Sequence, residues 1–376
     1  MSIVSIVWSS GKAYASIHKV HEQILSLVAV ADKSKVHTWM LQGREDAKRP
    51  ECGQLLYWGL SARALKGRGV WKLLQWWTQR RFAREIERIN PKALLLDGIG
   101  VARLIIPVVA RLNLPDLQIV VVFHGQSRIR RSDPMLFGSI PAHRLKLIAV
   151  SEALAESLCE DLRRPVSATR TAMNPHSFKQ ALLCRDEARA RLGIDNACTL
   201  LGAVGRLVEE KGFLPMLDVL YELARARAGI HLVLVGEGEQ RPELEERIRC
   251  LGLERMVTLA GHRQDAAQLY QAFDVMLIPS RSEGLGLVLQ EAVMAHVPVV
   301  ASNLPVFVEQ LGFSGVYVSP NDVFSWVAAI EQVLDSDRRL LADEQDRQLA
   351  PEDAWKEFCN GYVELLTDDS DPVKAS

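Results

Sequence analysis

Two basic residues, Arg206 and Lys211, stand five positions apart in the segment Gly205-Arg-Leu-Val-Glu-Glu-Lys-Gly212. The segment follows an apolar run and precedes an amphipathic one, so it connects a predicted strand to a predicted helix. Two cations beside a helix N-terminus suit a diphosphate, because the backbone N–H groups there also attract negative charge. A solvated loop is the other interpretation, and this motif alone leaves both open.

A second group of polar residues lies in the glycine-rich turn at 280–287 and in the segment after it. Glu283 falls within the turn, and Glu291 falls two helical turns into the predicted helix that follows. Glycines let the backbone approach a ligand closely, and a carboxylate accepts hydrogen bonds from a sugar or ribose diol. The pattern indicates a sugar or nucleoside site, and a surface position on the helix is the alternative for Glu291.

A third candidate follows the apolar run at 119–124, where His124 precedes a loop that carries Arg128, Arg130 and Arg131. Three arginines within four residues favour binding of a phosphate or carboxylate on a substrate, with ordinary loop charge as the alternative. The nine histidines form no H-E-x-x-H or H-x-x-E-H pattern, and none pairs with a cysteine at metal-binding spacing. We therefore predict no metal site.

The elements that carry these residues alternate between short apolar runs and amphipathic segments, which is typical of parallel sheets with crossover helices. Strands are expected at 2–8, 36–41, 93–97, 119–124, 146–151, 199–205, 231–236, 257–261, 275–280, 297–302 and 315–319. Helices are expected at 13–31, 70–89, 100–112, 152–163, 211–228, 240–251, 265–272, 286–295 and 322–335. Two such blocks predict two doubly wound α/β domains, with ligands beyond the carboxyl ends of the strands.

The charge of the chain divides in the same way as its elements. Residues 1–180 hold 27 Lys and Arg against 14 Asp and Glu, whereas residues 181–376 hold 18 against 32. A basic first domain favours an anionic partner: a phosphorylated substrate, a nucleic acid or a membrane surface. Nucleic acid fits poorly, because no aromatic and basic residues interleave and no binding motif is present.

A membrane surface is favoured by the predicted helix at 70–89. Trp76 and Trp77 lie beside Arg80, Arg81 and Arg84, a combination that suits an anionic lipid headgroup layer. Packing of the tryptophans under a neighbouring loop is the alternative. No apolar run approaches the ~20 residues that span a bilayer, so we expect a cytoplasmic protein, peripheral at the inner face of the cytoplasmic membrane.

Taken together, the motifs resemble glycosyltransferase family four, the retaining sugar transferases with the GT-B fold. The matching features are G-R-L-x-x-x-K-G at 205–212, the pair Glu283 and Glu291, and the segment around Trp355. The resemblance implies two Rossmann-like domains that face each other across a cleft. Residues 1–180 would bind the acceptor, residues 181–351 would bind the nucleotide sugar, and a helix at 352–367 would pack back on the first domain.

The resemblance also implies roles for individual residues. Arg206 and Lys211, with Gly205, would hold the donor diphosphate, and Glu291 would bind the ribose. Glu283 and His124 would contact the transferred sugar. The remaining implied positions are the backbone of Gly284, Leu285 and Gly286 near the sugar and phosphates, the acceptor-binding Arg128, Arg130 and Arg131, and the cleft-lining Ser151 and Asn174.

Two loops depart from the family pattern. The first strand–helix loop usually carries a Gly-Gly pair, but here Ser9-Ser-Gly-Lys12 keeps one glycine, so Gly11 and Lys12 are the expected donor-loop residues. The loop after the strand at 297–302 usually reads Gly-Gly-x-Pro-Glu, but here it is Ser302-Asn-Leu-Pro-Val306. The second departure bears on the identity of the sugar.

The resemblance implies transfer of a sugar from a nucleotide diphosphate sugar, expected to be a UDP-sugar, to a hydroxyl of a membrane-associated glycan or glycolipid. Synthesis of a lipopolysaccharide core or another cell-envelope polysaccharide fits the charge split. No cofactor or metal is expected. Two alternatives stay open: a GT-B sugar-phosphate epimerase or phosphorylase, and a non-catalytic subunit that binds nucleotide sugars.

Overall fold

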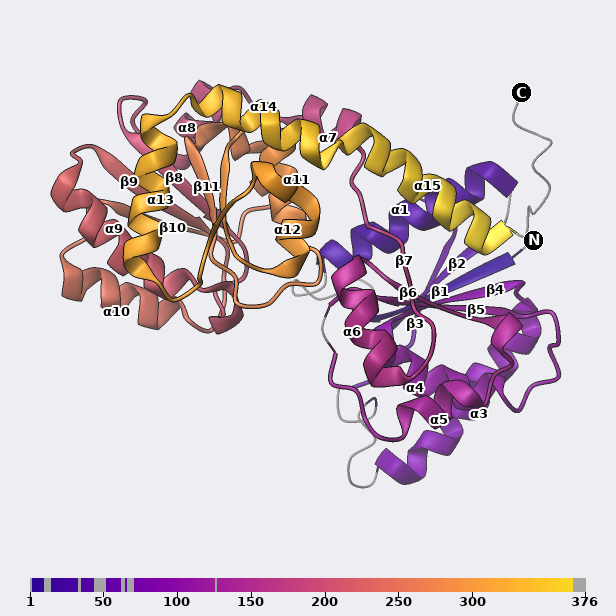
Figure 1. The fold of residues 1–376 in the computed structure, drawn as a ribbon. Coiled ribbons are helices and arrows are strands. Elements are labelled where there is room, and N and C mark those ends of the chain that lie inside the picture. Colours follow the sequence, from indigo (N-terminus) through magenta and orange to yellow (C-terminus); the bar gives the residue numbers. More distant parts are fainter. Residues whose placement is uncertain are drawn as a thin grey trace, which may run out of the picture. The chain divides into compact units, whose positions relative to one another are not determined.

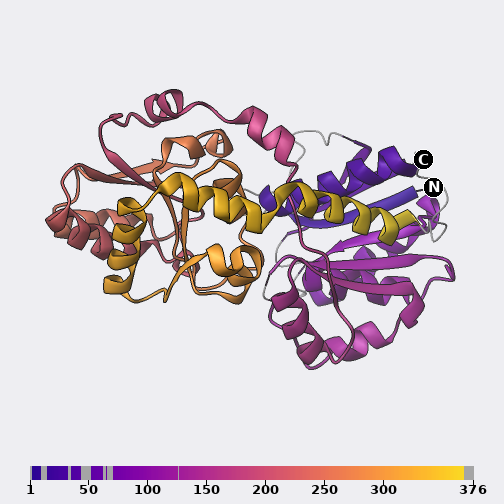
Figure 2. The ribbon, with the colours of Figure 1, turned by 45° about the horizontal axis from the view of Figure 1, so that its top comes forward.

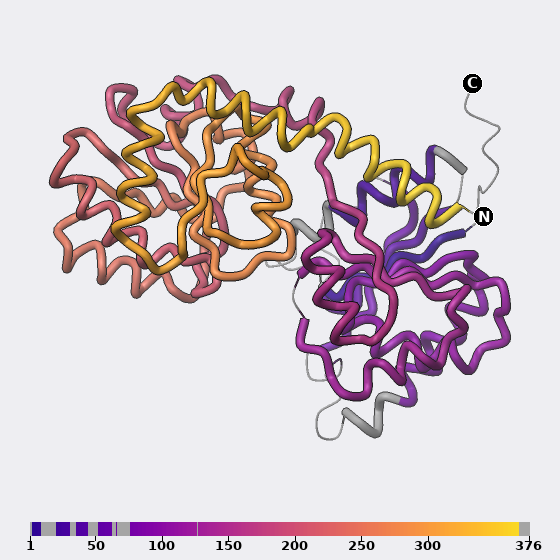
Figure 3. Tube along the Cα trace, viewed as in Figure 1, coloured from indigo at the N-terminus to yellow at the C-terminus, as the bar shows by residue number. Residues whose placement is uncertain are grey.

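The computed structural model describes residues 2–9, 15–32, 35–43, 52–61, 65, 71–125 and 127–367, whose Cα trace is coloured in Figure 3. The chain divides into two compact units (Figure 1). Unit 1 comprises residues 1–171 and 356–376, and unit 2 comprises residues 172–355. The sequence-based boundary after residue 180 falls inside α7 (Pro175–Ala181), a helix of unit 2.

Unit 1 is built on a seven-stranded parallel sheet with the strand order β3-β2-β1-β4-β5-β6-β7. The order reverses between β1 and β4, which lie side by side although two strands separate them in the sequence. The strands are β1 (Ser2–Ser9), β2 (Lys35–Gln42), β3 (Gln54–Tyr57), β4 (Ala93–Asp97), β5 (Gln118–Phe123), β6 (Leu145–Ala149) and β7 (Ser167–Ala168).

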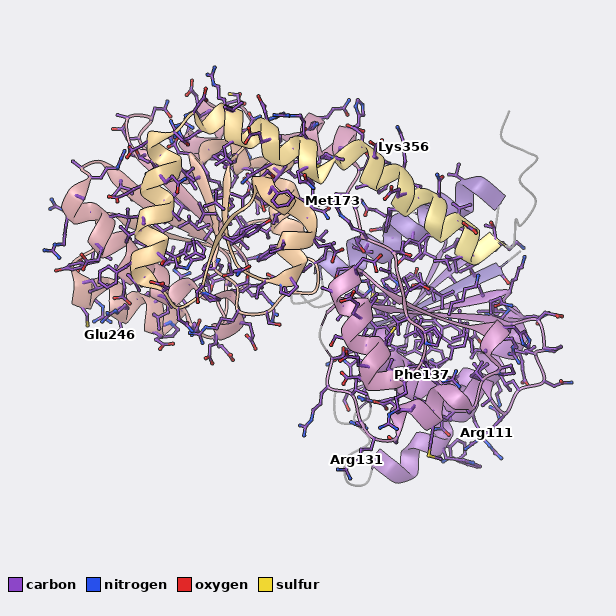
Figure 4. All side chains as sticks on the ribbon, in the orientation of Figure 1. Arg111, Arg131, Phe137, Met173, Glu246 and Lys356 are labelled. Atoms are coloured by element: carbon purple, nitrogen blue, oxygen red, sulfur yellow. The ribbon has the colours of Figure 1, made fainter. Side chains whose placement is uncertain are left out.

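Helices cover both faces of this sheet (Figure 1). On one face α3 (Trp71–Ile89), α4 (Gly98–Val109) and α5 (Asp133–Gly138) pack in succession. The opposite face carries α1 (Ala15–Asp32) and the part of α15 (Pro351–Thr367) that starts at Lys356, a residue labelled in Figure 4. The remaining helix of this unit, α6 (Glu152–Leu162), follows β6.

Unit 2 repeats the plan with a six-stranded parallel sheet in the order β10-β9-β8-β11-β12-β13. Its helices sandwich the sheet (Figure 2), with α9 between α10 and α13 on one face and α14 against α11 and α12 on the other. The strands are β8 (Thr199–Val204), β9 (Ile230–Val235), β10 (Val257–Gly261), β11 (Val275–Ile278), β12 (Val299–Ser302) and β13 (Val316–Val318). The other helices are α8 (Arg185–Leu192), α9 (Phe213–Ala226), α10 (Arg241–Leu251), α11 (Leu287–Met294), α12 (Pro305–Leu311), α13 (Val323–Asp335) and α14 (Arg338–Leu349).

The predicted fold class of two doubly wound parallel sheets is confirmed, and every predicted strand has a counterpart. The central strands are buried on both faces, which explains why they read as continuous apolar runs. The helix predicted at 265–272 is wrong, because that segment forms two short 3₁₀ turns, 266–268 and 270–272. Among the described residues, no helix combines the length and apolar character needed to cross a membrane.

A buried arginine fastens α8 to the sheet of unit 2. Arg189 is completely buried, and its Nη2 donates to the Asp274 carboxylate at 2.8 Å. Its other N–H groups donate to the carbonyl oxygens of Ala272, Asp195, Asn196 and Cys198. A buried charge is stable only when it is paired in this way, so Asp274 is the residue on which the cluster depends.

Candidate active site

The site in unit 2 forms where β8 and β11 lie side by side, the point at which the strand order reverses. Ligands of doubly wound sheets bind outside the carboxyl ends of the strands at such a point. The segments that leave these two ends are 205–212 and 279–286. The topology thus brings together the two motifs that the sequence keeps more than sixty positions apart.

Gly212 allows the two segments to touch. Its φ is +69°, and a Cβ atom there would lie 2.1 Å from the Pro279 carbonyl oxygen, so a side chain would collide with the neighbouring backbone. The Arg281 N–H donates to the Glu210 carbonyl at 2.8 Å, and the Arg281 guanidinium pairs with Glu209 at 2.7 Å. The backbone of one segment therefore fixes the position of the other.

Lys211 and Glu283 form an ion pair across this junction. Their side chains keep 19% and 13% of their exposure, and the Ser280 hydroxyl donates to the same Glu283 oxygen at 2.8 Å. Arg206 is exposed at the start of the first segment. The junction thus offers a hydrogen-bonded carboxylate next to an ammonium group, with a guanidinium on the same segment.

The Gly236–Gly238 turn supports the segment that carries Arg206. A Cβ atom on Gly236 would lie 1.7 Å from the Gly205 carbonyl oxygen, so only glycine permits this approach. The Leu207 N–H donates to the Glu237 carbonyl at 3.0 Å. The turn therefore has a structural role: it packs beneath the site.

The carboxylate of Glu291 accepts a hydrogen bond from a residue that the sequence motifs did not identify. The hydroxyl of Tyr270 donates to the Glu291 carboxylate, and Tyr270 is completely buried. Burial, followed by the adjacent Glu291 charge, raises the pKa of Tyr270 well above its ordinary value, so the phenol stays protonated and remains a donor. The bond fixes one carboxylate oxygen of Glu291.

The turn between the two glutamates is also anchored. Gly284 and Leu285 are buried, and the Leu285 carbonyl accepts a hydrogen bond from Gln310 Nε2 at 2.6 Å. Gly286 is the N-cap of α11, the helix that carries Glu291. This part of the site therefore has a fixed backbone.

A second polar cluster lies in unit 1, again at the reversal of strand order. Asp97 ends β4, His124 follows β5, and His21 reaches them from α1. His21 Nε2 and His124 Nε2 are 3.0 Å apart, and Asp97 Oδ1 is 4.0 Å from His124 Nε2. Ligand atoms of the three residues all lie within 4.8 Å of one another, so the set has the composition of a possible metal site.

The electrostatics of this cluster follow from burial. Burial lowers the pKa of His124 to about 4, so the imidazole is neutral at pH 7. Burial also raises the pKa of the Asp97 carboxyl to about 6, against the opposing effect of the Trp8 N–H, which donates to Asp97 Oδ2 at 3.2 Å. His124 therefore interacts as a neutral hydrogen-bonding group.

The three arginines after His124 are exposed, and Arg131 lies at the periphery of unit 1 in Figure 4. Arg130 lines a cavity of about 770 Å³ together with Arg103, Arg111 and apolar side chains of α4 and α5. Within it, Arg103 pairs with the buried Asp133 at 2.6 Å. The cavity combines cationic and apolar walls.

The other predicted site residues either cap helices or lie outside the residues that the structure describes. Ser151 caps α6 by accepting from the Leu154 N–H at 3.3 Å, and Asn174 caps α7 by accepting from the Ser177 N–H at 3.1 Å. Gly11 and Lys12 lie outside the described residues.

Comparison with known proteins associates the unit 2 motifs with a family. Residues 198–336 match the glycosyl transferases group 1 family. The D-inositol 3-phosphate glycosyltransferase of Corynebacterium kroppenstedtii is 31% identical over 49% of this chain and 43% of its own length. The lipopolysaccharide core biosynthesis glycosyltransferase LpsE of Rhizobium meliloti is 30% identical over 47% of this chain and 52% of its own length. The chain thus spans about half the length of these curated relatives.

Solved structures match almost the whole chain. A glycosyltransferase from Rickettsia africae superposes with a TM-score of 0.79 at 16% identity, over 98% of this chain and 99% of that one. HepE of Anabaena, solved in complex with UDP, superposes with a TM-score of 0.72 at 17% identity, over 98% of this chain and 99% of that one. This chain therefore has the GT-B fold, and its residues 198–336 are similar to the glycosyl transferases group 1 family.

Proposed function

We propose that this protein is a retaining glycosyltransferase that moves a sugar from a nucleotide diphosphate sugar to an acceptor hydroxyl. The observation that carries the proposal is the ion pair of Lys211 and Glu283 at the point where the strand order reverses, within the segment that matches the group 1 family. A UDP-sugar is the proposed donor, since HepE of Anabaena has the same fold and was solved with UDP.

In this proposal, different polar residues of unit 2 bind different parts of the donor. Lys211 and Arg206 stabilise the charge that develops on the departing diphosphate, because charge contacts count most where charge increases in the transition state. Glu291, oriented by Tyr270, accepts hydrogen bonds from the ribose. Glu283 and the neutral His124 contact the transferred sugar. Attack on the front face, with the departing phosphate helping to remove the acceptor proton, gives retention.

The proposed acceptor is a membrane-associated glycan or glycolipid, such as a lipopolysaccharide core. The relative LpsE supports this class. The cavity lined by Arg103, Arg111 and Arg130 adds chemical support, because its cationic and apolar walls suit an amphiphilic anion. We propose that the protein works at the inner face of the cytoplasmic membrane, without a metal or cofactor and without binding nucleic acid.

A transfer assay tests the function. The purified chain is incubated with a panel of UDP-sugars, with and without a deacylated or intact lipopolysaccharide core, and the anomeric configuration of the product is read by NMR. We expect acceptor-dependent release of UDP and an unchanged anomeric configuration. Acceptor-independent conversion of the sugar would favour an epimerase, phosphate-dependent cleavage would favour a phosphorylase, and binding without turnover would favour a non-catalytic subunit.

Glu291→Ala and Glu283→Ala should affect different steps. Glu291 is assigned to the ribose, which substrate and product share, so its loss should weaken UDP binding about tenfold, as expected for a hydrogen bond to a charged group. Glu283 is assigned to the sugar in transit, so its loss should mainly lower kcat. Isothermal titration with UDP and steady-state kinetics separate the two effects.

Two variants control this comparison. Tyr270→Phe removes the hydrogen bond to Glu291 and should show a smaller loss of UDP affinity than Glu291→Ala. Glu222→Ala, on α9, removes a glutamate whose ion-pair partner is the exposed Arg225, and should change neither quantity. Wild-type UDP affinity in Glu291→Ala would reject the ribose assignment.

Vesicle binding tests the membrane proposal. Trp76 and Trp77 are 47% and 64% exposed, and the Arg80 guanidinium lies 3.7 Å from the Trp76 ring centroid. Each basic residue near an anionic leaflet contributes about 1 kcal/mol, and salt screens this attraction. We expect co-sedimentation with anionic vesicles that falls as salt rises to about 0.5 M, and a further decrease when both tryptophans are replaced by alanine. Equal binding to neutral vesicles would contradict the proposal.

A further inference from the structure

We propose that His21 and Ser5 are positioning residues that fix the tautomer of His124 and make its Nδ1 a hydrogen-bond donor. Only the partner of that donor, the transferred sugar, rests on the proposed function. The assignment of the proton itself rests on the hydrogen bonds inside unit 1.

The three side chains form one linear series of hydrogen bonds. Ser5 lies in the middle of β1 and is completely buried, and its Oγ is 2.9 Å from His21 Nδ1. The other ring nitrogen of His21, Nε2, is 3.0 Å from His124 Nε2. Both distances are those of well-formed hydrogen bonds, so each of the two contacts must hold one proton.

The Ser5 hydroxyl determines the direction of the series. Within the described part of the chain, its hydrogen-bond partner is His21 Nδ1. A buried O–H group that does not donate costs more free energy than an unused lone pair, so Ser5 donates and His21 Nδ1 accepts. Because Nδ1 of His21 accepts, the ring proton of His21 lies on Nε2, which donates it to His124 Nε2.

The consequence for His124 follows from the hydrogen bond that its ring accepts. Because Nε2 accepts from His21, Nε2 carries no proton, and the ring proton of His124 must sit on Nδ1. Asp97 does not reverse this assignment, since its Oδ1 is 4.0 Å from His124 Nε2, beyond hydrogen-bonding distance, and its Oδ2 accepts from the Trp8 N–H. His124 is 10% exposed in its side chain, so it is the outermost member of the series.

A fixed donor at Nδ1 has a chemical use. A histidine that alternated between tautomers would present a donor for only part of the time, whereas this series keeps one N–H available before the ligand arrives. Such preorganisation lowers the cost of forming a contact in the transition state. We therefore infer that Ser5 and His21 act on catalysis through His124 without contacting the substrate.

The tautomer is read directly by ¹⁵N NMR of the ring nitrogens, with no need for activity. We expect the proton of His124 on Nδ1 in the wild-type chain. In His21→Phe, which keeps a ring at this position, and in Ser5→Ala, a small change suited to a buried strand, the proton should redistribute toward Nε2. His37→Phe, a substitution of another histidine of unit 1 in β2, serves as the matched control and should leave the His124 signals unchanged.

Kinetics give the second readout. His21→Phe and Ser5→Ala should lower kcat about tenfold, the effect expected for one hydrogen bond, and should leave UDP affinity unchanged. His21→Gln, whose amide N–H can replace the Nε2 donor, should restore most of kcat. A purely structural role for His21 would lower thermal stability in all three variants without this recovery.

The outcomes separate this inference from the proposed function. If the tautomers behave as expected and no sugar transfer is found, the proposed function fails and the positioning of His124 stands. A wild-type His124 protonated on Nε2, or an unchanged tautomer in both Ser5→Ala and His21→Phe, would overturn the positioning role. Stoichiometric zinc in the purified protein that is lost in His21→Phe would also overturn it, because the ion would replace the proton between the two rings.

Discussion

Replacing Lys211 by alanine should lower sugar transfer by about 10²-fold or more, because it removes a positive charge assigned to the departing diphosphate. Arg206→Ala should have an effect of the same order. Both residues lie on the segment after β8, which Gly212 and Gly236 hold against its neighbours. Steady-state turnover with a saturating UDP-sugar measures the effect.

The two variants differ in their expected stability. Arg206 is exposed, so its loss should change the free energy of unfolding by less than about 0.5 kcal/mol. Lys211→Ala leaves the partly buried Glu283 carboxylate without its cation and should cost about 1–3 kcal/mol. The matched control is Arg225→Ala on α9, which should retain full activity. Near-native turnover in both Lys211→Ala and Arg206→Ala would reject the diphosphate assignment.

Asp274→Ala should destabilise unit 2 by about 3–5 kcal/mol, because it leaves the buried Arg189 charge uncompensated. The Asp274 carboxylate accepts from Arg189, Arg185 and Arg338 at 2.7–2.8 Å and from the Leu200 N–H at 2.8 Å. Chemical denaturation followed by circular dichroism measures the loss. Asp335→Ala removes an exposed carboxylate paired with Arg227 and should cost less than about 1 kcal/mol.

The Asp274 carboxylate should also make the free energy of unfolding depend on pH. Burial alone would raise the pKa of Asp274, but the Leu200 N–H and the neighbouring guanidinium groups hold it below its ordinary value of 3.8. A carboxyl whose pKa is lower in the folded state stabilises the fold above the unfolded pKa and loses that contribution as pH falls through the folded one. The difference in stability between wild type and Asp274→Ala should therefore shrink below pH 4. A difference that stays constant down to pH 2 would contradict this role.

The sequence predicted those parts of the site whose residues are neighbours in the chain. Lys211 and Arg206 share one segment, and Glu283 and Glu291 share another, so spacing and a family resemblance sufficed to select them as candidates. The alternation of strands and helices also predicted that both segments would emerge at the same edge of a sheet, and the observed order of β8 and β11 confirms this.

The residues that sequence analysis missed act through contacts between distant segments. Tyr270 lies in a segment predicted as helix, and only the tertiary fold brings its hydroxyl to Glu291. Ser5 and His21 belong to β1 and α1, and the predicted site residue His124 follows β5, so no spacing rule connects the two missed residues to it. Asp97 offered one local signal, its position at the end of a predicted strand.

Short elements were missed for a related reason. β3 and β7 have four and two residues, too few to show a period, and the burial of β3 is only partial. α12 and α7 each have seven residues and begin at a proline. These elements depend on packing against the larger fold more than on local preference.

The helix α15 has a consequence for the order in which the chain folds. From Lys356 onward it belongs to unit 1, where Phe358, Tyr362 and Leu366 are almost completely buried and Lys92 Nζ donates to the Thr367 carbonyl across 275 positions of sequence. During synthesis, residues 2–171 leave the ribosome before α15 is made. The apolar surface of unit 1 that α15 covers therefore stays exposed until all of unit 2 has been synthesised. Unit 2 is continuous in sequence, so it needs no later segment of the chain to complete its fold. The second unit made can thus be the first to finish folding, and the closing of α15 onto unit 1 becomes the last event of co-translational folding and the step most exposed to chaperones.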